Sequence, residues 1–136
     1  MRATGIDLYN CDYPVNVSAT DEVLMRLQEL GRTEDIKFSP DCRRLVIAGF
    51  KKNKLLILDV EIISSLNEIS VSLTDFLEIT SPGLNRPHGL AFIDDETLVV
   101  ANRRGEVPVF KIPHGNGDKK KLQINASLTI GCNKKH

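Results

Sequence analysis

The side chains of this sequence that can do chemistry are scattered, and none of them falls in a known catalytic motif. His88, His114 and His136 are not spaced as a local metal site. The acidic run 94–96 is at best a weak calcium candidate, because aspartate at such a hairpin position is first of all a turn former. The sequence has no GxSxG, no HExxH and no glycine loop for phosphate. No local motif therefore predicts catalysis.

Three cysteines, Cys11, Cys42 and Cys132, lie far apart in the chain. An odd number without a CxxC pair predicts neither a disulfide framework nor a zinc knuckle. The N-terminal stretch MRATGIDLYN lacks the apolar run and the small-residue cleavage site of a signal peptide. The glycosylation-type triplets at Asn16 and Asn125 are then chance matches, and we expect a reducing, cytoplasmic location.

The composition indicates one globular domain without a strong electrostatic field. The chain has 136 residues, of which 41% are hydrophobic, and its 18 basic residues balance its 18 acidic residues. Such a balance provides no bulk field that would attract nucleic acid or an anionic membrane. No apolar run approaches the roughly 20 residues that cross a bilayer. We therefore predict neither a nucleic acid nor a membrane as partner.

One amphipathic helix is predicted over residues 19–30. Ser18 is the expected N-cap, with Asp21 three residues later as in a capping box, and Gly31 suits the stop. Apolar residues follow at helical spacing: Val23, Leu24, Leu27 and Leu30. The pattern favours a helix that covers an end or edge of a sheet, and a partner-binding helix is the alternative.

The segment 86–113 repeats the strand pattern of the segment 32–62. Ile36 and Phe38 match Leu90 and Phe92 at a separation of 54. Leu45 and Ala48 match Leu98 and Ala101 at 53, and Ile57 and Val60 match Val109 and Ile112 at 52. The separation changes only in the turns, where insertions and deletions are tolerated best.

A fourth strand is predicted in each repeat. In the first it covers Ile69, Val71 and Leu73, and in the second it lies within residues 119–130 through Leu122, Ile124 and Leu128. A period near fifty with four short strands per unit is typical of a β-propeller blade, and another antiparallel sheet is the alternative. Pro108 predicts a bulge or a strand start, because it cannot donate to a ladder.

Two motifs carry a family resemblance. The stretch DIKFSPDCRRLVIAGFKKNKLLILDVE (residues 35–61) resembles a blade of WD-like and YVTN-type propellers, in which a turn SPDG precedes the second strand; here Cys42 replaces the glycine. The stretch PHGLAFIDDETLVVANRRGEVPVFKI (residues 87–112) is similar to NHL-repeat and gluconolactonase-type propellers. The resemblance specifies a fold and leaves the activity open, because propellers host many functions.

The resemblance implies a mainly β fold with two four-stranded antiparallel propeller-type blades preceded by one helix. We expect an N-terminal segment over 1–31, blades over 32–85 and 86–130, and a polar tail over 131–136. Propellers close with roughly four to eight blades, which removes their edge strands. Two blades would form an incomplete propeller, so the chain is interpreted as a fragment or as a subunit that associates with copies or a protein partner through its open edges.

The family geometry also predicts a shared loop face. It gathers the candidate ligand or partner residues Arg32, Lys51, Lys52, Asn53, Arg86, His88, Asn102, Arg103 and Arg104. The opposite face would hold Asp41, Asp94, Asp95 and Glu96. Such a basic rim suits docking of an acidic partner or an anionic small molecule, and ordinary solvated turns are the alternative.

The function predicted from these features is a non-catalytic binding or scaffold module that needs no cofactor. The alternative, implied by the gluconolactonase-type resemblance, is part of a metal-dependent hydrolase in which calcium or zinc polarises a lactone carbonyl. Asn102 is the one candidate ligand for that metal. Otherwise we expect Asn102 to hydrogen-bond its own turn and His88 to satisfy a loop carbonyl.

Overall fold

The structure is a computed structural model that describes residues 2–3, 14–115 and 117–131, and it is mainly β with one described helix. The mainly β class predicted from the sequence is confirmed. The elements in chain order are β1 (Arg2–Ala3), β2 (Val15–Ala19), α1 (Asp21–Leu30), β3 (Thr33–Phe38), β4 (Arg44–Gly49), β5 (Lys54–Ser64), β6 (Ile69–Thr80), β7 (Pro87–Phe92), β8 (Thr97–Asn102), β9 (Val107–Lys111), β10 (Lys121–Gln123) and β11 (Leu128–Ile130). Cys11, Cys132 and His136 lie outside the described residues, as do residues 1 and 4–13 of the predicted N-terminal segment and residues 132–136 of the predicted tail.

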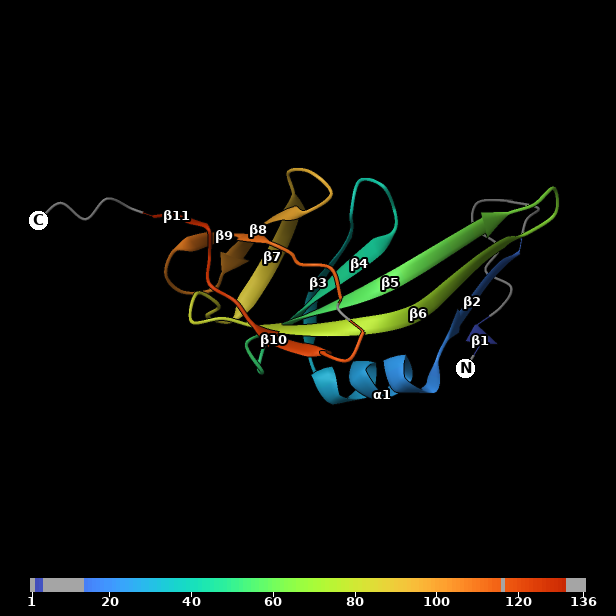
Figure 1. Cartoon of the computed structure of the whole chain (residues 1–136), viewed down its shortest axis with the longest axis horizontal. Helices are drawn as coiled ribbons and strands as arrows, with labels where there is room; N and C mark the ends of the chain where they lie inside the picture. Colours follow the sequence, from blue (N-terminus) through green and yellow to red (C-terminus); the bar gives the residue numbers. More distant parts are fainter. Residues whose placement is uncertain (1, 4–13, 116, 132–136) are drawn as a thin grey trace, which may run out of the picture.

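The described strands form two sheets, here named sheet A and sheet B (Figure 1). Sheet A has the order β1-β2-β6-β5-β4-β3, with β10 also paired to β6. Its central part, β3 to β6, is an antiparallel meander, whereas β2 and β10 run parallel to β6. Sheet B has the order β11-β9-β8-β7 and is antiparallel throughout.

Sheet A lies between α1 and sheet B (Figure 1). The side chains of one face of sheet A, among them Val46, Leu55 and Ile79, pack against sheet B. The alternate side chains, such as Ile47 and Leu58, pack under Val23 and Leu30 of α1. β4 is therefore buried on both faces, which explains its continuous apolar run.

The helix begins later than predicted because Thr20, not Ser18, is its N-cap. The Thr20 hydroxyl accepts from the backbone N–H of Val23 at 3.2 Å, while Ser18 belongs to β2 and pairs with Ser72 of β6. The preceding residues are thus committed to the sheet, and α1 starts at Asp21. A Cβ on Gly49 would lie 2.5 Å from Cδ1 of Leu30, so this glycine permits the close approach of α1 to β4.

The prediction for the last strands is wrong in its pairing. Leu122 lies in β10, which joins β6 in sheet A, and only Leu128 reaches sheet B, through β11. Ile124 follows β10 and donates its backbone N–H to Thr80. The segment after β9 thus returns to sheet A before it completes sheet B, because it covers Ile79 and the rest of the core between the sheets.

Two backbone features bear on the turns. The Cys42 N–H donates to the Ser39 carbonyl at 2.8 Å, and Cys42 has φ 60, so it adopts the left-handed conformation of the glycine that it replaces. Pro108 is the second residue of β9, near the strand start that was predicted for it.

Within the described residues, no helix has the length and apolar character needed to span a membrane.

Candidate functional site

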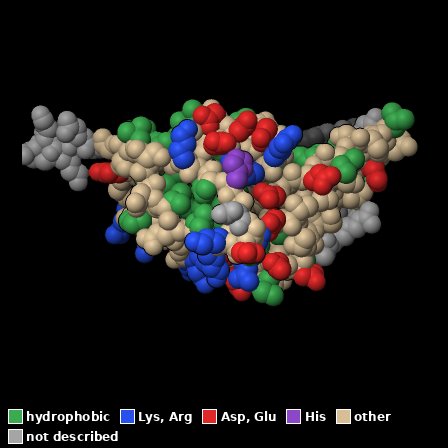
Figure 2. Space-filling model, in the orientation of Figure 1, with side chains coloured by type: hydrophobic (Ala, Val, Ile, Leu, Met, Phe, Trp, Pro, Cys, Tyr) green, Lys and Arg blue, Asp and Glu red, His purple; other side chains and the backbone are tan. Residues whose placement is uncertain are grey.

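The strands of the two sheets carry charged loops at two opposite ends. The loops before β3 and β7 and after β4 and β8 hold Arg32, Phe50, Arg86 and Arg103, and we call this the arginine end. The loops after β3 and β7 hold Asp41, Asp95 and Glu96, and we call this the acidic end. On the face shown in Figure 2, acidic and basic side chains lie interspersed. The contrast between the two ends therefore lies in these loops and not in a general separation of charge.

The arginine end is organised around the ring of Phe50. The guanidinium carbons of Arg32, Arg103 and Arg86 lie 5.0, 5.6 and 5.8 Å from its centroid. These distances are within the roughly 6 Å range of cation–π attraction. Phe50 itself is buried beneath the exposed arginines, at 8% exposure. The ring thus gathers three positive charges from loops of both sheets.

Backbone contacts of Arg86 hold these loops together. Its N–H donates to the Asn53 side chain at 2.6 Å, and its carbonyl accepts from the Arg103 N–H at 2.9 Å. Arg86 has φ 57, a conformation that is strained for a residue with a Cβ. The Arg32 carbonyl accepts similarly from the Phe50 N–H. A strained residue that neighbouring loops fix from both sides often marks a functional site.

Asn102 is an organiser of the same loops. Its Oδ1 accepts from the Asn85 N–H at 2.9 Å, and its Nδ2 donates to the carbonyls of Gly83 and Glu106. Both halves of the amide are therefore engaged in protein hydrogen bonds, and the expected contact with its own turn is present through Glu106. The lactonase-like alternative, with Asn102 as a metal ligand, stays a prediction.

His88 contacts a carboxylate rather than the loop carbonyl that was expected. Its Nδ1 lies 3.7 Å from Oε2 of Glu34, and its side chain is half exposed. The other Glu34 oxygen, Oε1, lies 2.8 Å from the Arg32 guanidinium. Glu34 thus neutralises Arg32 in part, whereas among the described residues no carboxylate pairs with Arg86 or Arg103.

The remaining candidate residues lie at the arginine end but are not among the cations over the Phe50 ring. Lys51 and Lys52 are exposed in the turn after β4. Arg104 lines a shallow depression of about 240 Å³ together with Asn102 and Glu106. The structure therefore brings Arg32, Asn53, Arg86 and Arg103 into one cluster and leaves Lys51 and Lys52 at its margin.

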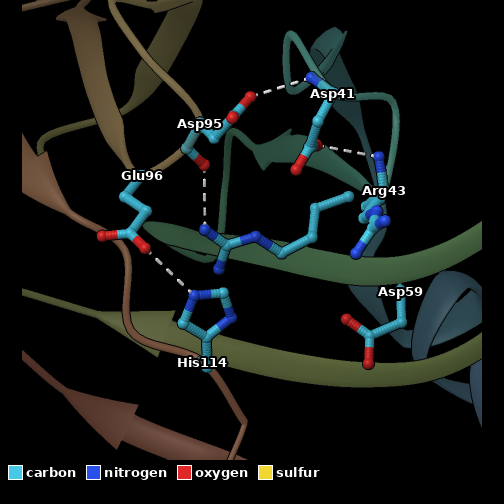
Figure 3. A pocket seen from close by; sticks show the side chains of 7 residues that line it. Asp41, Arg43, Asp59, Asp95, Glu96 and His114 are labelled. Carbon is cyan, nitrogen blue, oxygen red and sulfur yellow. Dashed lines mark hydrogen bonds and ion pairs between the residues drawn. The ribbon is translucent and has the colours of Figure 1, made fainter.

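The acidic end contains a larger depression, shown in Figure 3. It has a volume of about 380 Å³ and is lined by Asp41, Arg43, Arg44, Asp59, Asp95, Glu96 and His114. Asp95 faces Asp41 across the opening, and its carboxylate accepts from the Asp41 N–H at 2.8 Å. The His114 ring points at the Glu96 carboxylate, 3.2 Å away. The acidic side chains of this end are thus paired within the protein.

Arg44 fills the base of this depression and is only 7% exposed. Its guanidinium donates to the carbonyls of Asp95 and Pro113, both at 3.0 Å. Since these carbonyls belong to loops around sheet B, Arg44 ties β4 of sheet A to sheet B. The Arg44 guanidinium therefore serves to hold the two sheets together.

Carboxylates of the acidic end are stabilised in their charged form by the turns. The Ser39 hydroxyl, which donates to Asp41 at 2.6 Å, and the Arg43 N–H lower the pKa of Asp41 below its ordinary value. The Glu96 N–H, followed by Thr97, lowers the pKa of Asp94 in the same way. Both aspartates therefore act as turn formers, as expected from their positions.

One aspartate joins the two sheets. Burial acts to raise the pKa of Asp35, but the N–H groups of Leu90 and Ile36 outweigh it and lower the pKa. Leu90 belongs to β7, so this hydrogen bond fixes β3 of sheet A beside β7 of sheet B.

In the part of the chain that the structure describes, no group of three or more His, Cys, Asp or Glu side chains is arranged to hold a metal ion. Comparison of the chain with family models, with curated proteins and with solved structures finds no match. The site must therefore be interpreted from its own geometry.

Phe50, the residue at the centre of the arginine end, was not predicted from the sequence as part of a site. Phe50 lies in the turn segment GFKKN, where a large apolar side chain among lysines and glycine is out of place in a solvated turn. This apolar residue in a polar turn was the one sequence feature that could have indicated a role for Phe50. The structural role of Arg44 left no such signal, because it depends on carbonyls about fifty and seventy residues away in sequence.

Proposed function

We propose that the protein is a non-catalytic binding module whose arginine end docks an acidic segment of a partner protein. The observation that carries the proposal is the convergence of Arg32, Arg86 and Arg103 on the Phe50 ring. Each guanidinium lies closer to the ring centre than the Debye length of about 8 Å at physiological salt, so their fields add there. An anion above the ring would meet two guanidinium groups without an internal carboxylate.

The ligand class follows from the exposure of the cluster. Arginine binds a carboxylate with two parallel hydrogen bonds, and an exposed arginine keeps these donors available. Small-molecule sites are usually concave, with volumes of about 300–1,000 Å³, whereas the depression beside Asn102 measures about 240 Å³. An open basic surface suits a carboxylate-rich peptide segment better than an enclosed small anion.

The proposal is tested by fluorescence anisotropy with a labelled peptide of about ten glutamates. We expect saturable binding that weakens with added salt, and a loss of about tenfold in affinity for the double variant Arg86→Gln/Arg103→Gln, since exposed pairs contribute about 0.7 kcal/mol each. The matched control is Arg43→Gln/Lys119→Gln, which removes the same charge elsewhere and should bind almost as the unaltered protein does. Equal losses in both double variants would show that only net charge matters and would contradict the proposal.

We also propose, from the sequence resemblance, that the two sheets correspond to two blades of an incomplete β-propeller. What supports this is the repeated meander: β3-β4-β5-β6 in sheet A and β7-β8-β9-β11 in sheet B follow the same order. The pairs Val46↔Ile57 and Val99↔Val109 are equivalent in register. A crystal structure in which β3 and β7 lie apart would contradict this assignment.

A further inference from the structure

The outer face of sheet B, turned away from sheet A, is apolar and only partly covered by the described residues. Along β8 and β9, Leu98, Val100 and Phe110 point into the core between the sheets. The alternate residues point outward, and the register aligns them across the sheet: Val99 with Val109 and Ala91, Val109 with Leu128, and Val107 with Ile130. Leu128 and Ile130 are 60% and 54% exposed. We call this surface the open face.

The repeat shows what kind of surface the open face is. Sheet A holds sheet B through six residues, which are Val46, Ala48, Leu55, Ile57, Leu77 and Ile79. Their equivalents by the repeat separations and by strand register are Val99, Ala101, Val107, Val109, Leu128 and Ile130. All six equivalents are apolar and all lie on the open face. The first set is at most 4% exposed. In the second set Ala101, Leu128 and Ile130 are exposed, Val99 and Val107 are partly buried, and Val109 is 6% exposed. The open face therefore repeats a surface that elsewhere in the same molecule receives a sheet.

The opposite surface is already occupied. The residues of sheet A equivalent to the inward side chains of sheet B are Leu45, Ile47, Leu58 and Val60. They pack beneath Val23 and Leu30 of α1. A second copy therefore cannot offer this surface to the open face unless α1 leaves it. Among the described sheet faces, the apolar one that a second copy can offer is its own open face.

We propose that two copies of this chain associate through their open faces, sheet B against sheet B, about a twofold axis. Such an isologous contact uses the same surface on both copies and closes on itself, so it ends at a dimer. Stacked sheets pack about 10 Å apart through interdigitated side chains, and the mixture of alanine, valine and leucine on the open face suits this packing.

The expected affinity is modest. Four strands about 4.8 Å apart and about five residues long present a face of roughly 20 by 17 Å. This is smaller than the standard interface of about 800 Å² per partner. We therefore expect a dissociation constant in the micromolar range.

The test is sedimentation equilibrium of the full chain from about 1 to about 200 μM, in the concentration range set by that affinity. The solution contains reductant, because Cys42 is exposed and free. We expect the mass to rise with concentration from 15.1 kDa to twice that value and to stop there. A monomer throughout, or growth beyond a dimer, would overturn the proposal.

Variants locate the contact. Ala101→Arg places a charge at the exposed position of β8, and Ile130→Glu places one on a different strand of the same face. Both should give monomers at every concentration, with circular dichroism unchanged. The matched control is Leu66→Arg at the 88% exposed tip of the β5–β6 hairpin, which should still dimerise. Dimers that survive both face variants, or that Leu66→Arg dissolves, would also overturn the proposal.

Discussion

Arg44 at the acidic end and Arg86 at the arginine end lie at opposite ends of the same stacked sheets, and their guanidinium groups have different surroundings. Arg44 is 7% exposed, and its donors are used by the carbonyls of Asp95 and Pro113. Arg86 is exposed. Its backbone N–H is held by the Asn53 side chain, and its guanidinium lies over the Phe50 ring. A buried, hydrogen-bonded arginine therefore stabilises the fold, whereas an exposed one on a fixed backbone is available to a ligand.

Replacing Arg44 should cost the most stability. Arg44→Met removes the donors to the carbonyls of Asp95 and Pro113 and leaves these groups without partners. We expect a loss of about 3 kcal/mol in the free energy of unfolding, measured by urea denaturation, with no change in peptide affinity. Arg43→Met in the same turn, whose side chain is exposed, should change the free energy by less than about 0.5 kcal/mol. Similar values for the two variants would refute the structural role of Arg44.

Phe50→Leu tests the role of the aromatic ring at the arginine end. Leucine preserves most of the apolar burial but removes the ring that positions three guanidinium groups. We expect a loss of about 1.5 kcal/mol in stability and about fivefold in affinity for the glutamate peptide. The control Phe92→Leu, in the core between the sheets, should lose stability without losing affinity. If both variants bind equally well, the ring has no part in binding.

Cys42→Gly at the acidic end is a smaller change with the opposite sign. Cys42 has φ 60, and glycine relieves the clash of the Cβ in this conformation. We expect a gain of roughly 0.5–1 kcal/mol in the free energy of unfolding and unchanged peptide binding. A destabilised Cys42→Gly variant would show that the thiol makes contacts that outweigh the strain.

The smallest expected effect is on the loss of stability at low pH. The pKa values of Asp41 and Asp94 are lowered from 3.8 in the folded state, so their contribution to stability is present above about pH 4 and is lost as pH falls through the folded pKa. Asp41→Asn/Asp94→Asn should flatten the decline of stability between pH 5 and about pH 2. Urea denaturation across this range measures it, and an unchanged slope would assign the acid sensitivity to Asp35 and Asp75 instead.

Much of the fold was predictable because its pattern is local. The repeat separations of 54, 53 and 52 anticipated the strands β3 to β5 and β7 to β9, since alternation and turn residues act over a few positions. The pairing of β10 with β6 was not predictable, because a three-residue strand joins whichever edge the core leaves open. The N-cap was misassigned for a similar reason, because Ser18 has a partner strand that local reasoning does not reveal.

The candidate site was predictable in its charge and not in its arrangement. The propeller resemblance implied that Arg32, Arg86 and Arg103 lie among the loops of one face, and the structure gathers these three around one ring. The ring itself, Phe50, and the neutralising Glu34 depend on contacts between loops that no local pattern encodes. These contacts distinguish Arg86 and Arg103, which are available to a ligand, from Arg32, which is paired with Glu34.

The most direct test follows the arginine side chains themselves by nuclear magnetic resonance. The Nε–H signals of the ¹⁵N-labelled protein are recorded while the unlabelled glutamate peptide is added, with each signal assigned by its Arg→Lys variant. We predict saturable shifts at Arg86 and Arg103, a smaller shift at Arg32 because Glu34 competes, and none at Arg44. Shifts centred on Arg44, or no saturable shift at Arg86 and Arg103, would contradict the assignment of the arginine end as the docking surface.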